Sequence, residues 1–227
     1  MACQRGQAVS SAWSARPALA LHWNGAAWKR SGAPSSRGSA LDGVGIVSAA
    51  DIWAVGPSSG KTLTLRWNGT AWHRVPSPGP AGSTLSSVAA VSAGNGWAVG
   101  TISRDGNAHD KSLVLHWTGR AWKRVRSPGP GGPCMAGADG PYAVAASSAR
   151  SAWAVGDSYK FPSTFKTLVL RWNGASWKQV AAPSPAGSHL WGVAAVSASD
   201  AWAVGASGLT SQKTMILHWN GKAWSRQ

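Results

Sequence analysis

Trp117-Thr-Gly-Arg-Ala-Trp122 is one of five copies of a short phrase in which a turn separates two tryptophans. The other copies begin at Trp23, Trp67, Trp172 and Trp219. A second phrase, Trp-Ala-Val-Gly, begins at Trp53, Trp97, Trp153 and Trp202 and alternates with the first. Repetition of this kind along a chain is typical of architectures built from one repeated unit. The two phrases therefore decide the fold before any single residue does.

The unit over residues 85–125 predicts four short strands. They cover residues 87–92, 97–100, 113–117 and 122–125, and Gly, Asn or polar residues bound each of them. Four antiparallel strands that recur every 44–56 residues are typical of a β-propeller blade. The Asn-Gly pair in the first phrase predicts a two-residue hairpin turn, in which Leu65 faces Trp72.

The predicted fold is all-β, a β-propeller of five four-stranded blades in one domain over residues 1–227. The expected blades cover residues 1–30, 41–75, 85–125, 142–180 and 190–227. The first is shortened and contains the segments Ala8–Trp13 and Leu19–Trp23. Gly/Pro-rich linkers between the units are turns rather than domain boundaries. An open fragment of a larger propeller is the alternative, and the sequence leaves open whether the ring closes within one chain.

The composition is strongly basic. Lys and Arg number 22 against 7 acidic residues, all of them Asp, which gives a formal charge of +15. Such a charge attracts polyanions, although a genome rich in Arg codons would produce part of it without any partner. Cys3 and Cys134 are too few for a disulfide framework and fall in distant units, so no bridge is expected.

The sequence also bears on the compartment. No apolar run approaches the ~18 residues that span a membrane, and residues 1–10 lack the apolar stretch of a signal peptide. The surface is nevertheless rich in Ser, Thr, Gly and Trp. We therefore expect an extracellular or cell-surface protein without membrane insertion.

The stretch Gly96-Trp-Ala-Val-Gly100, followed by Trp117–Trp122, resembles the Asp-box (BNR-type) and related bacterial propeller repeats. The resemblance covers nearly the whole chain and implies the propeller fold. It departs from the family at the turn, where Asn or Thr replaces the Asp. Sialidases with such repeats need a Tyr/Glu nucleophile pair, and this chain has no Glu. The resemblance therefore implies a fold and no activity.

The two ends of the predicted propeller differ in their loops. Between the Gly of each Trp-Ala-Val-Gly phrase and the Lys that precedes the third strand lie 4, 10, 9 and 7 residues, whereas the turns at the other end are short and uniform. Variable loops on a rigid scaffold are the usual place for binding. The end that carries these loops, called here the variable end, is the predicted functional face.

One position at the variable end does not repeat. Where the innermost strand of each unit begins, the residues are Asp42, Ser86, Tyr142 and Trp191. An Asp, a Tyr and a Trp around a channel mouth suit a sugar or a polar small molecule, through stacking and hydrogen bonds. Neutral variation at a half-exposed position is the alternative explanation.

A recurring lysine precedes the third strand of each unit. These residues are Lys61, Lys111, Lys166 and Lys213. A ring of cations at the variable end suits an anionic polymer, and solvated strand ends are the simpler alternative.

Asp105, His109 and Asp110 share one loop, but such an isolated group is mostly solvated surface, so neither a metal site nor a cofactor is predicted.

The predicted function is non-catalytic recognition of carbohydrate or of an anionic cell-envelope polymer through the variable end. A protein–protein interaction scaffold is the alternative, and a glycoside hydrolase-like enzyme is the least favoured, because no carboxylate pair stands at equivalent places on adjacent loops. Nucleic acid is not an expected partner, since the repeated hairpin tryptophans are first of all core residues.

Overall fold

The computed structural model describes residues 17–103, 111–128, 140–158 and 165–227. All regular elements in these residues are β-strands, so the all-β prediction is confirmed. No helix long and apolar enough to cross a bilayer occurs in the part of the chain that the structure describes. The predicted strand within Ala8–Trp13, the Asp105–Asp110 group, Cys3 and Cys134 lie outside the described residues.

The strands form five antiparallel sheets, each built from strands consecutive in the chain. The first sheet contains β1 (Ala20–Trp23) and β2 (Trp28–Ser31). The second contains β3 (Gly43–Ser48), β4 (Asp51–Ser58), β5 (Lys61–Trp67) and β6 (Trp72–Arg74). The third contains β7 (Ser83–Ser92), β8 (Asn95–Ile102), β9 (Lys111–Trp117) and β10 (Trp122–Val125).

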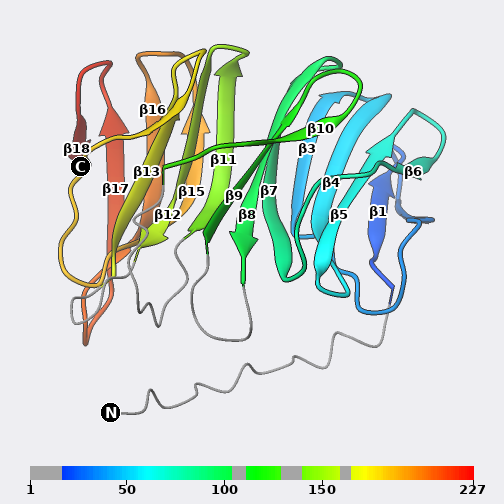
Figure 1. Cartoon of the computed structure of the whole chain (residues 1–227), viewed down its shortest axis with the longest axis horizontal. Helices are drawn as coiled ribbons and strands as arrows, with labels where there is room; N and C mark the ends of the chain where they lie inside the picture. The colour runs from blue at the N-terminus through cyan, green and yellow to red at the C-terminus, as the bar shows by residue number, and fades with distance from the viewer. Residues whose placement is uncertain (1–16, 104–110, 129–139, 159–164) are drawn as a thin grey trace.

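The fourth sheet contains β11 (Gly140–Ser148), β12 (Ser151–Ser158), β13 (Lys166–Trp172) and β14 (Trp177–Gln179). The fifth contains β15 (His189–Ala195), β16 (Ala201–Ser207), β17 (Lys213–Trp219) and β18 (Trp224–Arg226). Four four-stranded sheets and one shortened sheet give the predicted set of propeller blades. The sheets stand side by side in chain order, with β1 at one end of the row and β17 and β18 at the other (Figure 1).

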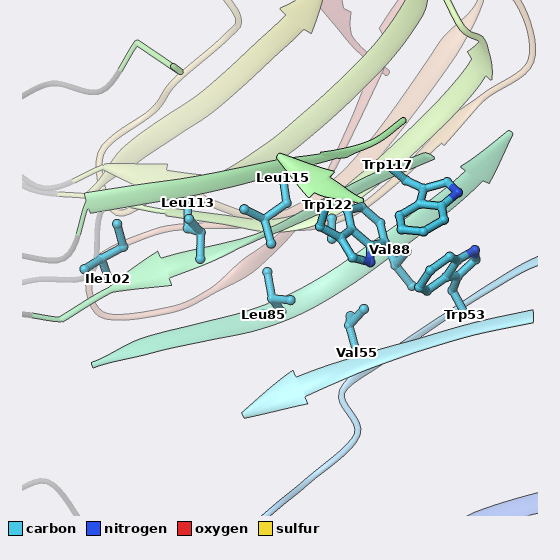
Figure 2. Close-up of a cluster of buried hydrophobic side chains, with 10 residues drawn as sticks. Trp53, Val55, Leu85, Val88, Ile102, Leu113, Leu115, Trp117 and Trp122 are labelled. Carbon is cyan, nitrogen blue, oxygen red and sulfur yellow. The ribbon is translucent and has the colours of Figure 1, made fainter. Parts of the chain in front are cut away.

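The core lies in the seams between neighbouring sheets. Trp53 of β4 packs against both hairpin tryptophans of the third sheet, with ring centroids 4.7 Å from Trp117 and 5.0 Å from Trp122. Figure 2 shows these three rings beside Val55 and Leu115, which are fully buried. Trp97 and Trp153 repeat the arrangement at the next two seams. At these three seams the second phrase supplies one ring, and the first phrase supplies the other two.

The hairpin turn differs from the predicted one. Trp67 pairs directly with Trp72, so the loop has four residues and Leu65 faces Arg74 instead of Trp72. The side-chain oxygen of Asn68 accepts hydrogen bonds from the backbone N–H groups of the second and third residues after it, at 3.0 and 2.9 Å. Only Gly69 has a positive φ, 97°. The prediction was wrong because Asn acts through its side chain rather than through a left-handed backbone.

A β-bulge interrupts the innermost strand of a sheet near its start. In the fourth sheet the pairing shifts between Pro141 and Ala143, which leaves Tyr142 as the extra residue. The Gly of the second phrase makes room for the bulge, because a Cβ at Gly156 would lie 2.0 Å from the carbonyl oxygen of Gly140. A bulge bends its strand and redirects the extra side chain. The repeated Gly therefore supports a position whose residue is free to vary.

Candidate binding site at the seam between the fourth and fifth sheets

Three of the four unrepeated positions predicted from the sequence are bulge positions of the inner strands. Ser86 and Trp191 are extra residues in β7 and β15, as Tyr142 is in β11. Asp42 precedes β3 at the equivalent place, and its backbone N–H donates to the carbonyl of Val55 at 2.8 Å. The structure thus explains why these residues differ while their neighbours repeat.

Two of these positions belong to one side-chain cluster, which crosses the seam between the fourth and fifth sheets. The Tyr142 hydroxyl donates to the carboxylate of Asp157, with distances of 3.2 and 3.4 Å to its two oxygens. Nδ1 of His189, on β15, also contacts this carboxylate. Because a carboxylate accepts hydrogen bonds, Nδ1 donates to Asp157, and Nε2 is the second polar atom of the ring. Asp157 thereby fixes the orientation of His189.

Aromatic rings extend the cluster toward solvent. The ring of Phe165 lies 4.6 Å from that of His189, centroid to centroid. The ring of Trp191 lies 6.2 Å from His189 on the same strand and is nearly parallel to it, at 10°. Trp191 is 52% exposed, whereas the Asp157 side chain is 1% exposed. The Asp157 cluster, formed by these five residues, therefore joins a buried anion to an accessible aromatic surface.

Burial raises the pKa of the Asp157 carboxyl above its ordinary value, and the hydrogen bonds from His189 and Tyr142 oppose that increase. A carboxylate that is desolvated and still hydrogen-bonded holds its partners in fixed positions. The arrangement can orient an imidazole toward a ligand that rests on Trp191. Among the described residues, no Ser, Thr or Cys side chain is hydrogen-bonded to His189.

The other two predicted site residues lie apart from the cluster, in the second and third sheets. Asp42 is exposed at the start of β3, and partial desolvation raises the pKa of its carboxyl. Ser86 is half-buried in β7. The structure brings Tyr142 and Trp191 into one site and leaves Asp42 and Ser86 at separate seams.

The recurring lysines each begin the third strand of a sheet at the variable end, and all four are exposed. They are Lys61 in β5, Lys111 in β9, Lys166 in β13 and Lys213 in β17. Lys166 pairs with Ser158, the residue after Asp157, so it is the lysine whose backbone lies next to the Asp157 cluster in the sheet. In the described ranges, no group of three or more His, Cys, Asp or Glu side chains is placed to hold a metal ion.

Asp157, His189 and Phe165 were not predicted as site residues. A signal for Asp157 was present, because the residue after Trp-Ala-Val-Gly is Pro57, Thr101 or Ala206 in the other units. Because only one of the four equivalent positions has a carboxylate, the unit that contains Asp157 differs chemically from the others. His189 lies 32 residues further along the chain, and only the packing of β15 against β12 brings the two side chains together.

The opposite end of the sheets carries an Asp–Arg ion pair and an Asp–His hydrogen bond. Asp51 accepts two hydrogen bonds from Arg66, at 2.7 and 2.8 Å, and Asp200 contacts His218 at 3.0 Å. The Arg66 guanidinium also lies 5.2 Å from the ring of Trp53 and 5.6 Å from that of Trp117. The Arg that recurs beside the hairpin Trp therefore bridges neighbouring sheets.

Comparison with solved structures supports the propeller fold. YCF48 bound to D1 peptide matches with 18% identity over 86% of this chain and 55% of its own, at a TM-score of 0.51. The fucose-specific lectin from Aleuria aurantia shows 15% identity over 92% of this chain and 69% of its own, at 0.53. The phage phi92 endosialidase shows 8% identity over 82% of this chain, at 0.51. At these identities the likeness concerns the fold alone.

This chain spans 55% of the YCF48 chain and 34% of the endosialidase chain. No protein family model matches it, and no curated protein matches it. The resemblance to Asp-box repeats therefore stays a prediction from the sequence, whereas the propeller fold is shown.

Proposed function

We propose that this protein is a non-catalytic recognition propeller that binds carbohydrate at the Asp157 cluster. The observation that carries the proposal is the half-exposed ring of Trp191 beside His189, whose orientation the buried Asp157 carboxylate fixes. The Ser/Thr/Gly/Trp-rich composition of the chain fits an extracellular or cell-surface setting for such binding.

The chemistry of the cluster suits a sugar ring. An exposed indole offers an apolar face on which the C–H groups of a pyranose can stack. Nε2 of His189 is suited to hydrogen-bond a hydroxyl of the same sugar, because a hydroxyl both donates and accepts. A few oriented polar groups beside an aromatic surface are typical of small-molecule sites.

The net charge favours an acidic glycan or another anionic cell-envelope polymer. The formal charge is +15, and Lys166 begins the strand that pairs with the end of β12, next to Asp157. Long-range attraction of this kind raises the rate of encounter and weakens as salt is added. A neutral sugar would bind through Trp191 without such a dependence on salt.

The positions of the carboxylates support a binding role over a catalytic one. The chain has no Glu, and the described Asp side chains are at four different places, Asp42, Asp51, Asp157 and Asp200. Asp51 and Asp200 form pairs at the end opposite to the Asp157 cluster. Glycoside hydrolysis normally needs two carboxyl groups that flank one bond.

Binding to an array of neutral and acidic oligosaccharides, called here the oligosaccharide panel, tests the proposal at moderate salt. Trp191→Ala should weaken binding to the strongest member of the panel roughly tenfold to a hundredfold, because binding energy concentrates in a few buried aromatic contacts. Asp200→Asn, at the opposite end of the same sheet, is the control and should leave affinity unchanged. Loss of binding in the control with full binding by Trp191→Ala would place the function at the other end.

A protein–protein interaction scaffold is the second candidate function, and the oligosaccharide panel distinguishes it from carbohydrate binding. YCF48, which shares the fold, is a protein solved with a bound peptide. No binding to any oligosaccharide of the panel, together with Trp191-dependent binding to a peptide library, would favour this second role.

A further inference from the structure

The fifth sheet exposes an apolar face that the inner sheets bury. Trp202, Val204 and Ile216 are between 38% and 47% exposed. Their equivalents in the fourth sheet, Trp153, Val155 and Val169, are 0% exposed. The equivalents in the second and third sheets are at most 1% exposed. The same three positions are therefore core in three sheets and open in the last one.

The first sheet exposes a second apolar face, whose equivalent in the third sheet is buried. Leu19, Leu21, Trp23 and Trp28 are between 48% and 66% exposed. Their equivalents in the third sheet are at most 4% exposed: Leu113, Leu115, Trp117 and Trp122. These leucines and hairpin tryptophans are the side chains that cover the preceding sheet at an inner seam.

An inner seam shows how the two kinds of face fit together. In Figure 2, Trp53 and Val55 of the second sheet lie against Leu115, Trp117 and Trp122 of the third. The exposed face of the fifth sheet, called here the tail face (Trp202, Val204, Ile216), corresponds to the first half of such a seam. The exposed face of the first sheet, called here the head face (Leu19, Leu21, Trp23, Trp28), corresponds to the second half.

The two faces cannot meet within the chain as it is arranged. The first and fifth sheets lie at opposite ends of the row (Figure 1), and the packing between described sheets joins those that are neighbours in the chain. Two unmatched apolar faces of this kind are unusual on a monomer and mark interaction surfaces.

We propose that copies of this protein associate head to tail, with the tail face of one copy packed on the head face of the next. The occupant is a second copy because the tail face needs a hairpin Trp pair and two leucines in one register, and this chain presents that set uncovered. Arg171 spans the rings of Trp153 and Trp219 at an inner seam, at 5.2 and 5.1 Å. His218, stacked on Trp202 at 4.2 Å, occupies the place of that Arg in the tail face.

Such an interface is heterologous, which provides a sharp test. Val204→Asp disables the tail face and Leu21→Asp disables the head face, so neither variant should associate alone. A mixture of the two retains one intact tail and one intact head, and it should form a complex of two chains and nothing larger. Leu209→Asp, at another exposed apolar residue of the fifth-sheet region, is the matched control and should associate as the parent does.

The readout is the molar mass by light scattering over a hundredfold range of protein concentration, with circular dichroism to verify that each variant is folded. We expect the parent to exceed 23.4 kDa in a concentration-dependent manner and the two variants alone to remain at that mass. A parent that stays monomeric throughout would overturn the proposal and indicate closure within one chain or an unoccupied face. Variants that still associate alone, or a mixture that forms no complex, would overturn it as well.

Discussion

The seam between the third and fourth sheets and the seam between the fourth and fifth sheets share one core and differ at one end. In the core, Trp97 and Trp153 each pack against two hairpin tryptophans, at 4.7–5.0 Å. At the variable end, the methyl group of Thr101 fills the space beside Gly140, where a Cβ would lie 2.1 Å away. At the next seam, Asp157 and His189 occupy the corresponding positions and bond to each other.

This difference separates two roles within one repeated unit. The buried centre of a seam tolerates little change, because close-packed rings leave no room for another shape. The end of a seam is partly open to solvent, so the side chains there can change without loss of the sheet packing. We therefore expect core substitutions to act on stability and substitutions at the seam end to act on binding.

Trp153→Ala should produce the largest effect. Removing a fully buried indole from between Trp219 and Trp224 leaves a cavity and should lower the free energy of unfolding by about 3–5 kcal/mol. Trp191→Ala, at the end of the same seam, should change it by less than about 1 kcal/mol. Urea denaturation of both variants measures the contrast, and similar losses would mean that Trp191 is a core residue.

Gly156→Ala and Gly100→Ala should destabilise the fold by similar amounts and differ in binding. The new Cβ would lie 2.0 Å from the carbonyl oxygen of Gly140 in the first case and 2.1 Å from that of Thr84 in the second. The inner strand must shift in either variant, at a cost of about 1–3 kcal/mol. Only in Gly156→Ala does the shifted strand carry Tyr142. Thermal melts with the oligosaccharide panel should therefore show equal loss of stability and a loss of binding in Gly156→Ala alone.

Gly69→Val tests the hairpin turn at the end opposite to the Asp157 cluster. Its φ of 97° is strained for a β-branched residue, which should cost about 1–3 kcal/mol. Binding should be unaffected because the second sheet takes no part in the cluster. Coinciding thermal melts of variant and parent would show that this turn tolerates another backbone conformation.

The smallest effect concerns the pH dependence of stability. Because burial raises the pKa of Asp157 in the folded state, the folded protein holds this proton to higher pH than the unfolded chain. This group's contribution to stability therefore falls as the pH rises above the ordinary value of 3.8 toward the raised one. Asp157→Asn removes that fall, so its stability relative to the parent should improve from pH 3.5 toward neutral.

Urea denaturation across that range measures the relative stability. His189 and Tyr142 face the same carboxyl, so the series is repeated with His189→Gln, which removes the imidazole. A difference between Asp157→Asn and parent that is independent of pH in both series would contradict the assignment. Thr101 stands at the equivalent position of the third sheet and should contribute no such dependence.

The sequence by itself determined the repeated parts of this protein. The two tryptophan phrases predicted five sheets, their strand order and the positions of Lys61, Lys111, Lys166 and Lys213 at the strand starts. It also identified the position that varies, which the structure explains as a β-bulge. These features follow from local patterns, because alternation and turn residues are properties of short segments.

Only the tertiary structure decided the remaining features. Asp157 and His189 meet because two sheets pack together, and no local pattern predicts a contact across 32 residues. The four-residue hairpin register is a local exception, because it depends on hydrogen bonds that the Asn68 side chain accepts from residues two and three positions later. The two uncovered end faces depend on whether the first and fifth sheets meet, which no pattern within one unit predicts. The binding site and the exposed end faces therefore depend on contacts between units, which the sequence of a single unit does not predict.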